Sequence, residues 1–135
     1  MKYSVAVLGA VAVALASISA LAGVKGAHFV GAPSISESGT TLSASGKVAG
    51  LGNVEQINVV VTADAACINP GNQDPAAANK ESFSAEGDFP VQNGKAEFSL
   101  DLTAAFKPDC TPPMTVVWSN ISITVTAPGV FLTYP

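Results

Sequence analysis

The chain has 135 residues, with six basic residues against ten acidic ones and a formal net charge of −4. This acidic balance, without any arginine, makes nucleic acid a poor partner, because phosphate binding depends on clusters of Lys and Arg. His28 is the only histidine and there are two cysteines, too few ligands for a zinc or copper centre and too few bases for a catalytic triad.

The N-terminal stretch has the layout of a secretory signal peptide. Lys2 supplies the positive charge, an apolar run covers 5–16, and Ala20-Leu21-Ala22 fits the small-x-small cleavage pattern. We therefore expect residues 1–22 to be removed and residues 23–135 to form one domain. The apolar run is shorter than the roughly 20 residues that span a bilayer, so we expect a secreted, extracellular protein with no membrane partner after cleavage.

Beyond the signal peptide, short runs rich in Ser, Thr, Val and Ile alternate between apolar and polar residues. Clusters of Gly, Pro, Asn and Asp separate these runs. This pattern predicts an all-β fold, a seven-stranded antiparallel β-sandwich that is immunoglobulin-like or fibronectin-like in outline. The expected strands are 33–37, 40–49, 55–64, 82–91, 95–106, 115–126 and 129–134.

Two turn sequences predict how neighbouring strands pair. Ser38-Gly39 predicts a hairpin in which Ile35 faces Leu42. Asn93-Gly94 is the stronger turn sequence and predicts a hairpin with one apolar and one polar face. Its apolar pairs are Val91 with Ala96, Phe89 with Phe98, Gly87 with Leu100, and Ala85 with Leu102.

The two cysteines predict one disulfide, Cys67 with Cys110. A single pair of cysteines in an exported chain most simply bonds within the chain. The bond would tie the irregular segment 68–80 to the Pro-rich connection 107–113. A long loop held on a rigid scaffold is typical of a contact surface. The candidate ligand contacts in this segment are Asn69, Asn72 and Asp74.

Paired carboxylates are the one catalytic arrangement that the composition permits. In the predicted hairpin over 82–106, Glu86 faces Asp101, with Asp88 and Glu97 close by. Such a group could bind calcium or serve as the acid and nucleophile of a glycan hydrolase. A solvated acidic face that keeps the protein soluble is the simpler interpretation. We therefore expect no catalytic residue, no metal site and no cofactor.

Trp118 has two alternative environments. Strict alternation along 115–126 places Val117 inside, and places Trp118 outside with Asn120, where the indole could stack on a sugar ring. A β-bulge near Ser119 would instead return Trp118 to the core, and we favour this arrangement. Asn120 also begins the chain's only glycosylation sequon, so it is a candidate glycosylation site.

Four stretches carry a resemblance to known proteins. They are His28-Phe29-Val30-Gly31-Ala32-Pro33, Ser45-Gly46-Lys47-Val48-Ala49-Gly50-Leu51-Gly52-Asn53, Ala66-Cys67-Ile68-Asn69-Pro70-Gly71-Asn72 and Pro113-Met114-Thr115-Val116-Val117-Trp118. Together they resemble a mostly uncharacterised group of short secreted proteins of filamentous fungi and soil bacteria. The resemblance covers nearly the whole mature chain. It implies secretion and a β fold and assigns no catalytic residue.

These observations predict a secreted, non-enzymatic protein that recognises a host, cell-surface or cell-wall component, either a protein or a glycan. The contact surface is expected in the segment 68–80. One alternative is a carbohydrate-binding module that uses Trp118. The weakest alternative is a glycan hydrolase that uses Glu86 and Asp101.

Overall fold

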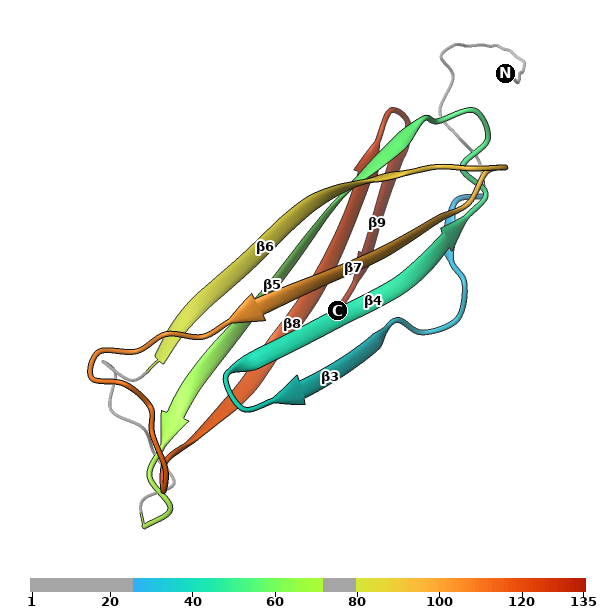
Figure 1. Ribbon diagram of the computed structural model, residues 1–135. Helices are drawn as coiled ribbons and strands as arrows, with labels where there is room; N and C mark the ends of the chain where they lie inside the picture. Colours follow the sequence, from blue (N-terminus) through green and yellow to red (C-terminus); the bar gives the residue numbers. More distant parts are fainter. Residues whose placement is uncertain (1–25, 72–79) are drawn as a thin grey trace.

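The computed structural model describes residues 26–71 and 80–135, so the expected signal peptide lies outside the described residues. Across these two ranges the chain forms strands and no helix, which confirms the all-β prediction (Figure 1). Accordingly, no helix of these ranges is long and apolar enough to cross a membrane. The described residues form eight strands instead of seven. They are β2 (His28–Phe29), β3 (Ser34–Ser38), β4 (Thr41–Ala49), β5 (Gln56–Ile68), β6 (Lys80–Pro90), β7 (Ala96–Thr103), β8 (Thr115–Ala127) and β9 (Val130–Tyr134).

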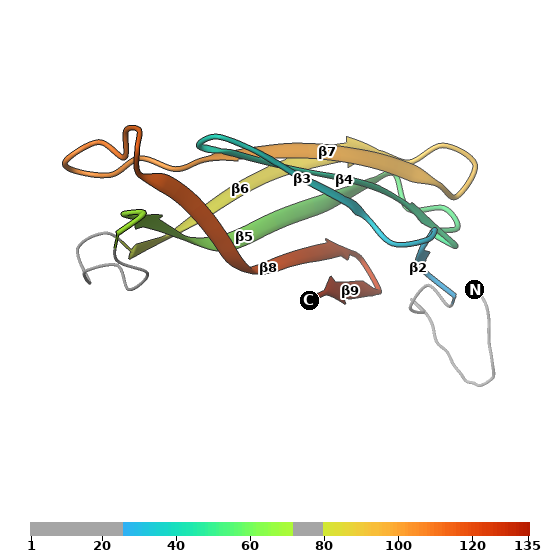
Figure 2. The same cartoon turned by 90° about the horizontal axis from the view of Figure 1, so that it is seen from below.

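The strands form two antiparallel four-stranded sheets. In the first sheet, β2 and β3 pair with successive parts of one side of β4, and β7 pairs with its other side. In the second sheet the order is β6-β5-β8-β9. Figure 2 shows the two layers facing each other. This arrangement agrees with the predicted β-sandwich.

The core lies between the two sheets. Along β5, Ile57, Val59 and Val61 are fully buried, and the residues between them point outward. The same alternation continues to Cys67, so β5 runs on to Ile68 instead of ending at 64 as expected. Burial of each larger apolar side chain contributes roughly 1.5–3 kcal/mol. The largest buried side chains are Leu42, Leu51, Ile57, Leu102, Ile123, Val48, Val59, Val61, Val125 and Cys67.

The turn at Asn93-Gly94 is confirmed, but the hairpin ladder predicted beyond it is wrong. Gln92 and Lys95 exchange backbone hydrogen bonds of 2.8 and 3.0 Å. Asn93 and Gly94 both have positive φ, as a tight two-residue hairpin turn requires. Beyond the turn, β6 pairs with β5 and β7 pairs with β4, so the two strands enter different sheets.

Residues predicted to pair along the ladder instead meet across the core. The rings of Phe89 and Phe98 pack edge to face with centroids 6.4 Å apart. A Cβ on Gly87 would lie 3.3 Å from Leu100. The predicted inward and outward faces of β6 and β7 are therefore confirmed. Each sheet needs a partner layer to cover its apolar face, and sending the two strands to opposite layers provides it.

The hairpin between β3 and β4 also differs in register. Its turn is Gly39-Thr40, and Ile35 lies opposite Ala44 instead of Leu42. The partner changes by two residues, which leaves every side chain on its expected face because the side-chain period of a strand is two. Gly39 has a φ of 57°, a conformation that glycine adopts without steric cost.

Candidate functional site

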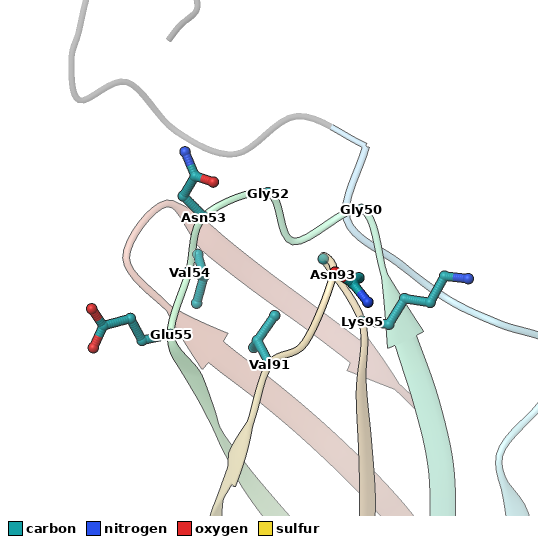
Figure 3. A pocket seen from close by; sticks show the side chains of 9 residues that line it. Gly50, Gly52, Asn53, Val54, Glu55, Val91, Asn93 and Lys95 are labelled. Atoms are coloured by element: carbon teal, nitrogen blue, oxygen red, sulfur yellow. The ribbon is translucent and has the colours of Figure 1, made fainter.

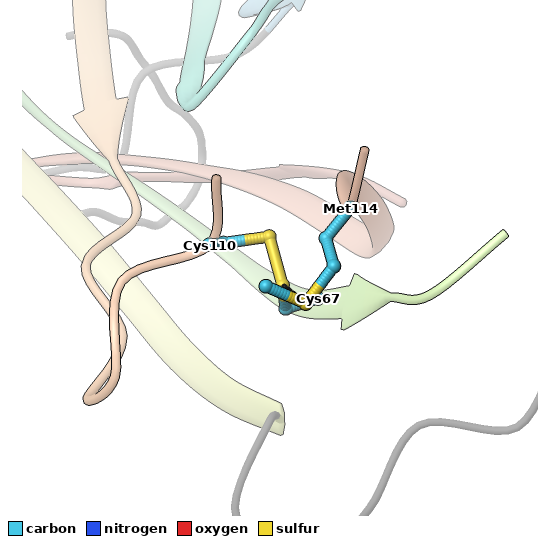
Figure 4. Close-up of a disulfide and its surroundings, with 3 residues drawn as sticks. All are labelled: Cys67, Cys110 and Met114. Atoms are coloured by element: carbon cyan, nitrogen blue, oxygen red, sulfur yellow. Dashed lines mark hydrogen bonds between the residues drawn. A yellow bond between two sulfur atoms is a disulfide. The ribbon is translucent and has the colours of Figure 1, made fainter. Parts of the chain in front are cut away.

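The predicted disulfide between Cys67 and Cys110 is confirmed (Figure 4). The two Cα atoms are 5.7 Å apart, and the bond joins positions 43 residues apart in the chain. Cys67 is buried, and its Sγ lies 3.8 Å from Sδ of Met114. The bond therefore ties the end of β5 to the connection between β7 and β8 at one end of the sandwich.

The segment 68–80 begins at this disulfide. Asn69 is exposed, and its Oδ1 accepts a hydrogen bond of 3.0 Å from the backbone N–H of Gly71, which forms a local turn. Asn72 and Asp74, the other two candidate contacts of the segment, lie outside the described residues. A contact surface in this segment therefore stays a prediction.

Trp118 lies in the core, so its assignment as a ligand contact is wrong. Its side chain is 6% exposed, and its ring packs edge to face on Phe83 with centroids 6.0 Å apart. The favoured β-bulge is confirmed, because the ladder between β5 and β8 shifts between Thr62 and Asp64. Asn120 sits in the bulge with a φ of 52°. The extra residue reverses the alternation and turns the indole inward.

The bulge places Asn120 beside Asp64 on the outer face of the second sheet. Nδ2 of Asn120 donates a hydrogen bond of 2.8 Å to Oδ2 of Asp64, and Oγ of Ser82 donates one of 2.6 Å to Oδ1. These two hydrogen bonds hold the pKa of Asp64 below its usual value, and the bond from Ser82 has the larger effect. Desolvation acts in the opposite direction and is the smallest of the three effects. Asn120 is exposed, and its glycosylation stays a prediction.

We expect Ser82→Ala to raise the pKa of Asp64, and Asn120→Ala to raise it by less. A folded-state pKa below the unfolded-state value means that these hydrogen bonds stabilise the fold at neutral pH. This stabilisation is lost as the pH falls through the folded-state pKa. An NMR titration of the Asp64 carboxyl carbon measures the change, with Ser84→Ala as the control on the same face of β6. An unchanged pKa in both variants would contradict the assignment.

Glu86 and Asp101 do not face each other, so the predicted carboxylate pair is wrong. Glu86 belongs to β6 in the second sheet, and Asp101 belongs to β7 in the first. On the second sheet, Asn58 donates a hydrogen bond of 2.9 Å to Glu86 and one of 3.0 Å to Asp88. Glu97 lies on β7, in the first sheet. Within 26–71 and 80–135, no three or more His, Cys, Asp or Glu residues lie close enough together to hold a metal ion.

The structure contains a crevice that no sequence pattern predicts (Figure 3). It lies between the loop that joins β4 to β5 and the turn that joins β6 to β7, and its volume is about 750 Å³. Because β5 begins beside this crevice and ends at the disulfide, the two features lie at opposite ends of the sandwich (Figure 1). The lining residues are Gly50, Gly52, Asn53, Val54, Glu55, Val91, Asn93, Gly94 and Lys95.

Backbone hydrogen bonds join the two walls of the crevice. Leu51 N–H donates to the carbonyl of Gly94 at 2.9 Å, and Val91 N–H donates to the carbonyl of Glu55 at 2.9 Å. Gly50 has a φ of 74°, and a Cβ there would collide with the carbonyl oxygen of Gly26. These contacts fix both loops on the scaffold, so the crevice is formed before any ligand binds.

The crevice combines apolar and polar side chains. Val54 and Val91 are half-buried and pack against the core. Glu55 and Lys95 extend to opposite sides (Figure 3). The lining also includes two asparagine amides, which can both donate and accept hydrogen bonds. Of the residues that the structure describes, those in the lining include no His, Cys, Ser or Thr and a single carboxylate, so they provide binding groups and do not pair a nucleophile with a base.

Comparison with known proteins gives no match. This holds for family models, for curated proteins and for solved structures. The resemblance to secreted proteins of fungi and soil bacteria therefore stays a prediction.

Proposed function

We propose that the protein is a secreted, non-enzymatic recognition protein that binds a host, cell-surface or cell-wall component in the crevice. The observation that carries this proposal is the preformed crevice between two loops that are hydrogen-bonded to each other at the end of the sandwich. Loops on a rigid scaffold are frequent binding surfaces, because the scaffold holds them in place without ordering cost at binding.

Two further features support secretion. The Cys67–Cys110 disulfide is of a kind that persists in oxidising compartments and is rare in the cytosol. Residues 1–22 have the charge, apolar run and cleavage pattern of a signal peptide. Both features favour an extracellular protein.

The lining of the crevice favours a polypeptide segment of a partner protein as the ligand. Asn53 and Asn93 can each pair with a peptide group, which has one donor and one acceptor. Glu55 and Lys95 can bind opposite charges at the two sides. A glycan is the second candidate: the lining has hydrogen-bonding amides, but its described residues include no aromatic ring on which a sugar could stack.

We expect the double variant Asn93→Ala, Lys95→Ala to weaken ligand binding by about tenfold or more, because it removes two hydrogen-bonding side chains from the lining of the crevice. An affinity screen of the mature, oxidised protein against cell extracts and cell-wall glycans identifies the ligand, and calorimetry then measures its affinity. Lys107→Ala is the matched control, since Lys107 is exposed and belongs to the connection that the disulfide at Cys110 holds at the other end.

Deletion of residues 70–78 separates this proposal from the predicted contact surface in the segment 68–80. If the deletion abolishes binding and the Asn93, Lys95 double variant binds normally, the site lies at the disulfide end and the crevice assignment is wrong. If the deletion leaves binding intact, the segment is not the contact surface.

Each of the two alternative functions was predicted from an arrangement of side chains that the described residues do not have. A carbohydrate-binding module based on Trp118 would need an exposed indole, and Trp118 is buried. A hydrolase based on Glu86 and Asp101 would need the two carboxyl groups side by side, and they belong to different sheets.

A further inference from the structure

Two tight turns line the crevice, and their tips carry backbone donors. In the first turn, Val54 N–H donates to the carbonyl of Leu51 at 3.2 Å, which leaves Gly52-Asn53 at the tip. The second turn has Asn93-Gly94 at its tip. A turn's own hydrogen bond does not use the N–H groups of its two tip residues. Within 26–71 and 80–135, these four N–H groups have no backbone acceptor, so they are available to a ligand.

The two tips lie against each other. A Cβ on Gly94 would lie 3.5 Å from the backbone nitrogen of Gly52. Because residue 94 is a glycine, it places no side chain over the Gly52 N–H. Leu51, the residue before Gly52, donates its own N–H to the Gly94 carbonyl at 2.9 Å, which holds the tips together. Closely spaced backbone N–H groups in turns form anion-binding sites.

The side chains of the lining add donors on one side of the crevice. Lys95 has an ammonium group, and Asn53 and Asn93 have amide donors. Glu55, the single carboxylate among the described lining residues, extends to the side opposite Lys95 (Figure 3). The net charge of −4 is spread over the chain and is screened beyond about 8 Å at physiological salt, so these neighbours decide which group is bound. One ammonium and no arginine match a single negative charge, such as a carboxylate, better than a phosphate.

We propose that the crevice binds the C-terminal carboxylate of a partner polypeptide, held by the turn tips and Lys95. This recognition rests on the proposed function, because it names the part of the ligand that binds in the same crevice. A chain end fits the lining better than an acidic side chain. Its carboxylate lies next to its own side chain, so one residue can contact both the donors and the half-buried Val54 and Val91. Backbone N–H groups are a recurring means of capturing terminal carboxylates.

The lining also predicts the residues near that chain end. Val54 and Val91 favour an aliphatic last residue, because the contact buries apolar surface of both partners. Glu55, on the far side from Lys95, favours a basic residue earlier in the ligand. We therefore expect a partner that ends in an aliphatic residue and carries Lys or Arg shortly before it.

A library of hexapeptides of varied sequence, labelled with fluorescein at the N-terminus and made both as free acids and as C-terminal amides, tests the proposal. Fluorescence anisotropy measures their binding to the mature, oxidised protein. We expect the strongest free acids to bind at least about tenfold more tightly than their amides, because amidation removes the negative charge. Lys95→Gln should remove most of this preference. Lys107→Gln is the matched control at the other end of the sandwich and should keep it.

The proposal is overturned if no free acid binds more tightly than its amide. It is also overturned if Lys95→Gln, with an unchanged circular dichroism spectrum, keeps the full preference. Oligogalacturonate, which carries its carboxylates on sugar rings, provides the comparison with an acidic glycan. Binding of this glycan in place of the free acids would show that the ligand is not a polypeptide end.

The ligand from the affinity screen separates this proposal from the proposed function. If that ligand loses binding in the double variant Asn93→Ala, Lys95→Ala but binds equally well with extra residues fused to its C-terminus, the carboxylate assignment is wrong and the proposed function stands. If the double variant binds it normally, the crevice is not the site and the proposed function fails as well.

Discussion

Replacement of Trp118 with alanine is expected to lower the free energy of unfolding by about 3–5 kcal/mol, the usual cost of removing a buried aromatic side chain. Trp118 is 6% exposed and packs on Phe83, which in turn packs on Phe106 with ring centroids 6.1 Å apart. The variant leaves a cavity in this aromatic cluster. Urea unfolding followed by circular dichroism measures the loss.

Trp118→Phe is the matched control and should cost much less. It keeps an aromatic ring in the cluster and removes the indole Nε1, which is buried and has no hydrogen-bond partner within 26–71 and 80–135. A cost below about 1 kcal/mol for Trp118→Ala would mean that the indole is exposed, as strict alternation along β8 requires. In that case β8 would have no bulge at Asn120, and Trp118 would again be a candidate residue for binding a sugar.

Loss of the disulfide should have an effect of similar size. The double variant Cys67→Ala, Cys110→Ala is expected to lose about 4 kcal/mol of stability, because the bond closes a loop with a sequence separation of 43 residues in the unfolded chain. For a domain of this length the loss corresponds to a fall in melting temperature of roughly 15 °C.

Reduction of the unmodified protein provides the control for this variant. Chemical reduction and the double variant should give the same loss, because both remove the constraint on the unfolded chain. Thermal unfolding with and without reductant makes the comparison. Two free thiols in the mature, unreduced protein would contradict the disulfide and remove the main structural support for secretion.

Local patterns predicted the strands well. Alternation along β5, β6 and β7 assigned the inward residues correctly, since the period of a strand is a property of the backbone. The Asn93-Gly94 turn was also predicted, because asparagine and glycine readily adopt positive φ. The Cys67–Cys110 bond followed from the number of cysteines alone.

Strand partners could not be read from the same patterns. A turn at Asn93-Gly94 is compatible both with one hairpin and with two strands that separate into facing sheets. In each case Phe89 lies opposite Phe98. The choice depends on β4 and β5, which are distant in sequence and offer better partners for β7 and β6. The prediction that Glu86 faces Asp101 was wrong for this reason.

The crevice could not be predicted either. Its two walls, the Gly50-Leu51-Gly52-Asn53 loop and the Asn93-Gly94 turn, are both recognisable as turns, but they are remote in sequence. They come together because β5 pairs with β6, so that the start of β5 lies beside the end of β6. Leu51 then bonds to Gly94 and completes the crevice.

The sequence by itself determined where seven of the eight described strands lie to within four residues, which face of these strands is apolar, where the Asn93-Gly94 turn forms and which cysteines bond. These properties follow from backbone periodicity, φ preferences and composition, which act within a few residues. Only the tertiary structure decided which strands pair, that Trp118 is buried and that two distant loops form a crevice. These properties depend on the simultaneous burial of two apolar faces, to which every strand of the sandwich contributes.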